Sequence, residues 1–275
     1  MKFLKITISE FLHVFGMLWL IVEATSFFVT DEAAGSVKGY WRGFLLVGIL
    51  IVIFRLIPKK RFSFKLDGKD ITMELVSGDI FKQKGPIVVG SNTTFVTSLD
   101  VISERSIQGI FTKKYYTNHQ ALNDVIQGQI SGDKQEFGTT VTVRANERTG
   151  YFCALADVNE NGVAQSNIEN IRVSLAELWN YLGSNGEKDV LNVPILGSGF
   201  SRVSATREEL FQEIVKSFIA STSEHTFCDG LRIVIHPDDI KKNNIDLLEL
   251  ASFLEYSCKY SIVESTSMGQ GIAEG

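Results

Sequence analysis

Residues 189–203 read DVLNVPILGSGFSRV, and this stretch decides the fold because it joins an apolar run to a glycine-rich loop. The run 190–196 is typical of a strand that is buried on both faces. It stops at the Gly-Ser-Gly of residues 197–199, shortly before a helical pattern opens. Glycines there let backbone N–H groups approach an anion, and a helix N-terminus adds partial positive charge. The stretch therefore predicts either a phosphate-binding loop or a plain tight turn after a core strand.

The composition limits the classes of partner. The chain has 275 residues and a net charge of −5, which allows one domain of ordinary size plus an appendage. This charge does not suit a basic nucleic-acid binder, so no nucleic-acid partner is expected. The cysteines, Cys153, Cys228 and Cys258, have no metal-ligand spacing. We therefore expect reduced, largely buried thiols and no metal site.

Two apolar runs lie in residues 1–61. Residues 11–29 read FLHVFGMLWLIVEATSFFV, and residues 40–57 read YWRGFLLVGILIVIFRLI. A run of this length is about enough to cross roughly 30 Å of hydrocarbon as a helix. A cleavable signal peptide competes for the first run, but no clear small-x-small cleavage pattern follows it and a second run comes next. The pattern predicts a transmembrane helical hairpin over residues 1–61.

The flanking charges predict the orientation of this hairpin. Basic residues lie at 2–5 and 59–61, whereas the loop 30–39 carries more acidic than basic residues. By the positive-inside rule both termini and the following domain are cytoplasmic, in a two-span protein of the cell inner membrane. Glu23 lies inside the first run, where a charge is costly. It would face a bundle or pore built from several copies, which makes a homo-oligomer necessary, or it would sit near the outer interface without a role.

From residue 62 the patterns of strands and helices alternate. The expected strands are 62–66, 70–76, 86–90, 139–143, 151–156, 190–196 and 231–235, and the expected helices are 118–130, 167–182, 205–221 and 245–256. This alternation predicts an α/β fold, a three-layer α/β/α sandwich with a mixed sheet, over residues 62–264. The Gly/Ser-rich residues 265–275 are expected to form a flexible tail.

Polar residues follow two of the expected strands. Asp79 either accepts a hydrogen bond from an amino group of a ligand or caps the next turn. Asn92, Thr93 and Thr94 follow the buried strand 86–90, and open α/β sheets bind ligands at the carboxyl ends of such strands. These three residues would hold a ribose hydroxyl and a phosphate, or they form an Asx or ST turn without a ligand.

Three segments, taken in order, resemble the macrodomain family, which binds ADP-ribose and related molecules. SGDI at 77–80 is similar to that family's adenine-binding turn, and VVGSNT at 88–93 resembles its VNAAN strand end. VPILGSGF at 193–200 resembles its P-x-x-GTG-I/F-G diphosphate loop. The likeness covers roughly residues 62–260 and implies a macrodomain-like fold.

The resemblance also implies a set of ligand-binding residues. They are Asp79, Ile80, Ser91, Asn92, Thr93, Thr94, Phe95, Leu196, Gly197, Ser198, Gly199, Phe200, Ser201, Arg202 and His236. Phe200 would cover the distal ribose or its adduct. Arg202 either pairs with a phosphate or is a solvated surface residue, and His236 either packs on the adenine or is structural.

Two departures from the macrodomain pattern narrow the function. Macrodomain hydrolases carry glycines after the VNAAN asparagine, whereas residues 95–99 read FVTSL, so ligand binding without turnover, no catalytic residue and no cofactor are expected. Two apolar runs before a divergent macrodomain resemble the membrane effector of type II Thoeris anti-phage defence systems. This resemblance implies a TIR-domain partner that makes histidine–ADP-ribose from NAD; the effector binds this signal, assembles and disrupts the membrane. A membrane-anchored ADP-ribosyl hydrolase and a ligand-free docking module for another protein are the alternatives.

Overall fold

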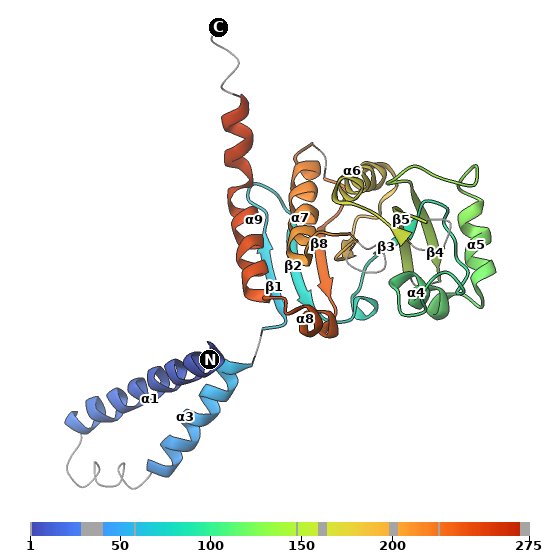
Figure 1. Ribbon diagram of the computed structural model, residues 1–275. Helices are drawn as coiled ribbons and strands as arrows, with labels where there is room; N and C mark the ends of the chain where they lie inside the picture. The colour runs from blue at the N-terminus through green and yellow to red at the C-terminus, as the bar shows by residue number, and fades with distance from the viewer. Residues whose placement is uncertain are drawn as a thin grey trace. The chain divides into compact units, whose positions relative to one another are not determined.

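The chain forms two compact units, Met1–Lys59 and Lys60–Gly275. The computed structural model in Figure 1 describes residues 2–28, 41–57, 59–146, 148–158, 164–197, 203–224 and 226–269. The described residues of the first unit form the helices α1 and α3, and the second unit contains the sheet with its covering helices.

The first unit pairs α1 (Lys2–Phe28) with α3 (Trp41–Leu56). Gly48 of α3 lies against the ring of Phe15, and a Cβ atom at this glycine would lie 2.5 Å from the ring Cζ. Glycine thus lets the two helices approach closely. Many of the other apolar side chains are exposed, and Trp19 keeps 70% of its surface accessible.

The prediction of two membrane spans is not supported. Among the described residues, no helix is both long enough and apolar enough to cross a membrane. The helix α3 has 16 residues, fewer than the roughly 20 that a span requires. The helix α1 has 27 residues, but ionisable groups interrupt it, and one of them, Glu23, is exposed. Val29 and Tyr40, which the predicted spans included, lie outside the described residues.

The second unit is built on a mixed sheet. Its strands are β1 (Arg61–Lys65), β2 (Thr72–Ser77), β3 (Ile87–Asn92), β4 (Thr140–Ala145), β5 (Arg148–Val158), β6 (Ala164–Gln165), β7 (Val190–Pro194) and β8 (Gly230–Ile235). The order is β1-β2-β8-β7-β3-β5-β4, with β6 paired to β5. The five central strands are parallel, whereas β1 and β4 run antiparallel at the two edges. This arrangement confirms the predicted mixed α/β sheet.

Helices cover both faces of the sheet, as predicted (Figure 1). One face packs against α6 (Ile168–Asn185), α7 (Arg207–Glu224) and α9 (Leu247–Gly269), and the other against the 3-10 turn η1 (Ile80–Lys82), α4 (Ile107–Tyr115) and α5 (His119–Gln127). A short helix, α8 (Pro237–Asn243), follows β8. The sequence analysis missed α4, and the first five residues of the predicted tail belong to α9.

A row of polar side chains crosses the sheet on the face of η1. Glu74, Arg232 and Asn192 are direct cross-strand neighbours on β2, β8 and β7. The guanidinium of Arg232 donates to the Glu74 carboxylate and, over 3.1 Å, to Asn192 Oδ1. Asn192 Nδ2 in turn donates to the carbonyls of Lys84 (2.8 Å) and Pro86 (3.0 Å). The loop before β3 is thereby fixed to the middle of the sheet.

The strands β3 and β7 form a seam in this sheet. Their pairing has one bridge, Ile87 with Asn192, at the amino end of β3. The chain leaves β3 toward β5 on one side and leaves β7 toward β8 on the other side. Connections that diverge in this way leave a crevice at the carboxyl ends of the two strands. The fold therefore places a ligand-sized opening beside the ends of β3 and β7.

Candidate functional site

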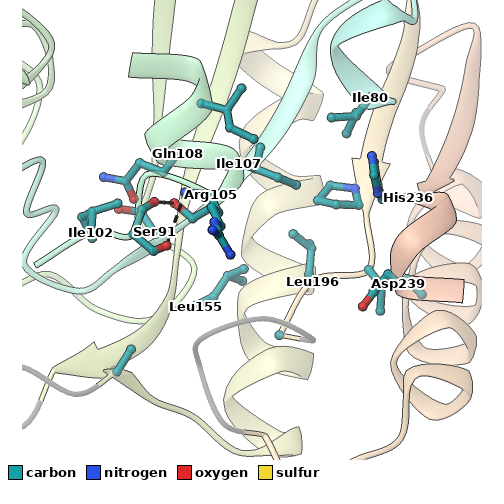
Figure 2. Close-up of a pocket in the computed structure, with 18 of the residues that line it drawn as sticks. Ile80, Ser91, Ile102, Arg105, Ile107, Gln108, Leu155, Leu196, His236 and Asp239 are labelled. Atoms are coloured by element: carbon teal, nitrogen blue, oxygen red, sulfur yellow. Dashed lines mark hydrogen bonds between the residues drawn. The ribbon is translucent and has the colours of Figure 1, made fainter. Parts of the chain in front are cut away.

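A cavity of about 930 Å³ occupies the crevice at the carboxyl ends of β2, β3, β7 and β8. Its walls are the turn 78–81, the end of β3, residues 194–197, the start of α8 and the segment 99–110. Figure 2 shows Ile80, His236 and Asp239 at one end and Ser91, Ile102 and Arg105 at the other. The volume lies in the usual range for small-molecule sites.

Asp79 lies in the wall of this cavity and also caps η1. Its Oδ1 accepts from the backbone N–H of Phe81 over 2.9 Å, so the capping interpretation is confirmed. Its Oδ2 makes no hydrogen bond with a described residue and can accept from a donor in the cavity. Ile80 lines the same end, where it offers an apolar surface for a flat ring.

Ser91 and Asn92 bring the end of β3 to the cavity. The Oδ1 of Asn92 accepts from the N–H groups of Thr94 and Val96, both over 3.1 Å, and from the Thr94 hydroxyl over 2.9 Å. These bonds make an Asx-type turn, one of the two interpretations of this segment. The oxygen is therefore occupied by the protein, and only the amide nitrogen of Asn92 remains to donate to a ligand.

The next predicted ligand residues do not line the cavity. Thr93 is fully buried, and its hydroxyl donates to Asp157 Oδ1 over 2.9 Å. Phe95 is fully buried in the apolar cluster beneath α4 and α5. Its φ of 50° is rare for a side chain of this size. The structure thus places Thr93 and Phe95 in the protein interior and Thr94 in the turn, away from the cavity wall.

The bond between Asp157 and Thr93 predicts a pH dependence of stability. Lys134 Nζ lies 2.5 Å from Asp157 Oδ2, and this hydrogen bond, with that of Thr93, lowers the pKa of the Asp157 carboxyl. A lowered folded-state pKa stabilises the fold above the unfolded pKa of about 4, and that stabilisation is lost as pH falls through the folded pKa. We expect the Asp157→Asn variant to melt at a slightly lower temperature than the parent protein at pH 7. Below pH 4 the difference between the two melting temperatures should become smaller. Melting curves at both pH values measure this, and an equal gap at both would contradict it.

The glycine-rich loop enters the cavity at its described end. Leu196 is buried and lines the cavity with Gly197. Gly197 has a φ of +78°, which favours glycine, and a Cβ atom there would lie 2.9 Å from Ile171 Cδ1. The other loop residues predicted to bind the ligand, Ser198, Gly199, Phe200, Ser201 and Arg202, lie outside the described residues.

His236 lines the same end of the cavity as Ile80. Its Nδ1 accepts from the backbone N–H of Asp238 over 3.3 Å, which caps the start of α8. The side chain is 58% exposed, so the ring serves as a cap and leaves a face open to the cavity.

The sequence analysis missed one wall of the cavity, the segment 99–110. This wall includes Ile102, Arg105, Ile107 and Gln108 (Figure 2). An N-cap signal was available, because Ser106 precedes the apolar spacing of α4 and its Oγ accepts from the N–H of Gly109.

The described residues include no metal cluster and no charged thiol. They contain no group of three His, Cys, Asp or Glu side chains that could hold a metal ion. Burial raises the pKa of Cys153, Cys228 and Cys258 to about 12, so these thiols are uncharged at neutral pH and poor nucleophiles. None of these three cysteines lines the cavity.

Comparisons with known proteins agree with this architecture. Residues 73–236, from β2 to the end of the sheet, match the model of the family described as Thoeris protein ThsA, Macro domain. The chain is similar to Thoeris protein ThsA of Bacillus amyloliquefaciens strain Y2, with 22% identity over 222 residues that cover 74% of each protein. It also resembles the Oceanobacillus iheyensis macrodomain with ADP (TM-score 0.52, 14% identity, 75% of this chain and 100% of that chain). A variant of that macrodomain with ADPR gives a TM-score of 0.51 at 14% identity, over 74% of this chain and 98% of that chain. Since the family model spans more than half of the chain, the chain belongs to the family of Thoeris ThsA macro domains.

Proposed function

We propose that this chain is a nucleotide sensor of an anti-phage defence system and that its cavity binds an ADP-ribose-derived signal. The observation that carries the proposal is the convergence of three distant segments on one cavity. The turn at Asp79, the strand end at Asn92 and the loop at Gly197 all line it. Membership of the Thoeris family supports the defence role, and the solved relatives with ADP and ADPR support the ligand class.

The walls suggest how such a ligand lies. The free Oδ2 of Asp79 accepts a hydrogen bond from the amino group of the adenine, while the side chain of Ile80 packs on the adenine ring. Gly197 opens the loop that receives the diphosphate, because its left-handed backbone permits a close approach. The remaining end of the cavity, beside Ser91, then receives the second ribose and whatever is attached to it.

The same geometry favours binding without turnover. The carbonyl oxygen of Asn92 is occupied by its own turn, and the thiols are uncharged. A hydrolase would need a group that activates water near the second ribose; the described wall there holds no histidine, and Asp100 is its carboxylate. The hydrolase remains the second candidate and is tested by the same experiment.

We propose that binding of the signal causes several copies of the chain to assemble. The helices α1 and α3 expose apolar side chains along their length, among them Trp19 at 70% and Phe54 at 77%. Proteins in water rarely expose apolar surface on this scale without a partner. We propose that copies of the chain, and the lipids of the inner membrane, cover it once the signal binds. A TIR-domain protein that makes histidine–ADP-ribose is the proposed source of the signal.

The test uses the full chain in mild detergent. Calorimetric titration with histidine–ADP-ribose is expected to show one site per chain, and light scattering after size exclusion is expected to show a larger assembly with this ligand. Intact ligand recovered afterwards supports a sensor, whereas released ADP-ribose supports the hydrolase. Absence of binding to this ligand, to ADP-ribose and to ADP would overturn the proposal.

A further inference from the structure

The end of the cavity opposite Asp79 has a chemistry of its own. Figure 2 shows the guanidinium of Arg105 directed into the cavity beside Ser91, with Leu196 between this end and His236. The wall 99–110 carries Asp100 as well as Arg105, and the far end has Asp79 and Asp239 with Lys114 over the ring of Phe81. A ligand that brings a hydrogen-bond donor to Asp79 and an acceptor or anion to Arg105 would satisfy both side chains.

Arg105 makes no ion pair or side-chain hydrogen bond with any residue in the described part of the chain. Other arginines of the second unit are engaged: Arg148 donates to the carbonyls of Phe81, Gln83 and Gly85, and Arg232 pairs with Glu74. The carboxylate next to Arg105 in the sequence, Glu104, is bound to Lys113 at 2.5 Å. The guanidinium fork is thus available to carboxylate or phosphate oxygens, which it binds in a bidentate manner.

Ser91 supplies a second, independent observation. Its side chain is only 7% exposed, and its hydroxyl oxygen has no hydrogen-bond partner among the described residues. Buried hydroxyls are nearly always bonded, because leaving one unbonded costs free energy. Since Ser91 lines the cavity beside Arg105, a rotation about its χ1 bond would bring this hydroxyl to an oxygen atom of a bound ligand, which would supply the missing partner.

The turn that carries Arg105 is held in place before any ligand arrives. The N–H of Arg105 donates to Ser103 Oγ over 3.3 Å, and Ser106 Oγ donates to the Ser103 carbonyl over 2.7 Å. A Cβ atom on Gly109 would lie 2.3 Å from that carbonyl oxygen, so glycine is required for this packing. Gln108 ties α4 to the turn after β3 through the Val96 carbonyl at 2.8 Å. A preorganised turn loses little entropy on binding.

We propose that Arg105 and Ser91 form an anion subsite that receives an acidic group carried by the ligand beyond its diphosphate, on the second ribose. The assignment rests on the proposed function, in which the adenine lies at Asp79 and the diphosphate at Gly197. The acidic group is a carboxylate or a phosphate, and the subsite makes the cavity prefer such derivatives over plain ADP-ribose. Arg105 is therefore a specificity-determining residue.

The experiment compares five probes on the full chain by calorimetric titration. ADP and ADP-ribose lack the distal acid, histidine–ADP-ribose carries a carboxylate, and ADP-ribose 1″-phosphate carries a phosphate. Arg105→Ala is expected to weaken binding of one or both acidic probes by about 10- to 100-fold, the usual range for a hydrogen bond to a charged group. ADP and ADP-ribose should change by less than about threefold. Histamine–ADP-ribose, which lacks only the carboxylate, should behave as ADP-ribose does.

Arg144→Ala is the matched control, because Arg144 lies on β4, is 70% exposed and does not line this cavity. It should leave all affinities unchanged. An equal loss for ADP and the acidic probes in Arg105→Ala would place Arg105 on the diphosphate and overturn the inference, as would no loss at all. A parent chain that binds none of the probes would instead overturn the proposed function. The acidic probe whose affinity falls more in Arg105→Ala shows whether the subsite prefers a carboxylate or a phosphate.

A second variant tests Ser91 with two readouts of opposite sign. Ser91→Ala removes a buried hydroxyl that has no partner, so the ligand-free protein should melt at a higher temperature. The same change should weaken binding of the acidic probe by about three- to tenfold, because the ligand loses one hydrogen bond. A variant with lower stability and unchanged affinity would show that Ser91 is only structural.

Discussion

Replacing Gly90 by valine is expected to abolish nucleotide binding while the protein still folds. Gly90 lies near the end of β3 and lines the cavity. A Cβ atom there would lie 2.7 Å from Leu155 Cδ1 and 4.0 Å from Leu196 Cδ2. Leu155 also lines the cavity, so the new side chain and the displaced leucine fill the space that the ligand needs. We expect a loss of affinity of at least about 100-fold for every adenine nucleotide.

The backbone accommodates this change. Gly90 is not among the glycines with a positive φ, and valine is favoured in strands. Overpacking of this kind costs about 1–3 kcal/mol of unfolding free energy. Gly183→Val is the matched control, because a Cβ atom on this glycine of α6 meets nothing within 4 Å. Calorimetric titration of both variants measures the effect, and near-parental affinity in Gly90→Val would show that the ligand binds elsewhere.

Replacing Arg232 by methionine is expected to lower the free energy of unfolding by about 3–5 kcal/mol. Its side chain is only 12% exposed, and that of Glu74 is 13% exposed. Removing the cation leaves the carboxylate in a dry site, and Asn192 Oδ1 loses its donor as well. Breaking a buried pair on one side costs more than the pair contributes, because the Glu74 charge is then left with the half-exposed Arg61, whose Nη1 lies 3.8 Å from Glu74 Oε1.

Urea unfolding followed by circular dichroism measures this loss. Arg172→Met serves as the control, because Arg172 also binds a carboxylate, that of Glu213, but on the surface of α6. Its loss should be much smaller, since exposed pairs are screened by water. The double variant Glu74→Leu with Arg232→Met should lose less than Arg232→Met alone. Equal losses for Arg232→Met and Arg172→Met would show that the pair at Glu74 is solvated.

The sequence predicted the strands of the sheet because their signals are local. The runs that became β3 and β7 are apolar and end at glycine or asparagine, and these ends do line the cavity. Of the two roles predicted for Asp79, capping is confirmed, because a carboxylate before a turn is a strong local signal. The positions of these residues at strand ends therefore predicted where the cavity lies. They did not predict which group each side chain contacts.

The rest depended on tertiary contacts that no local pattern contains. Arg105 lies in a turn without periodicity, where an arginine between Glu104 and Ser106 reads as solvated. Phe95 was assigned to the ligand because it follows the strand end, but a buried left-handed turn directs it into the core. Apolar composition also suggested two spans, whereas α3 is too short to be one.

The segment 93–139 supplies both the wall that carries Arg105 and the helices over one face of the sheet. The two ends of this segment lie close together at the sheet. The Gln135 N–H donates to the Thr93 carbonyl. The Thr93 N–H donates to the Ala156 carbonyl, and the Gly138 N–H donates to the Ala154 carbonyl. A segment whose two ends meet can be exchanged as a cassette, since replacing it strains no other connection. An engineered replacement of this one piece would therefore change the wall at Arg105 and leave the other walls of the cavity in place, provided that it again buries apolar side chains against β3, β4 and β5.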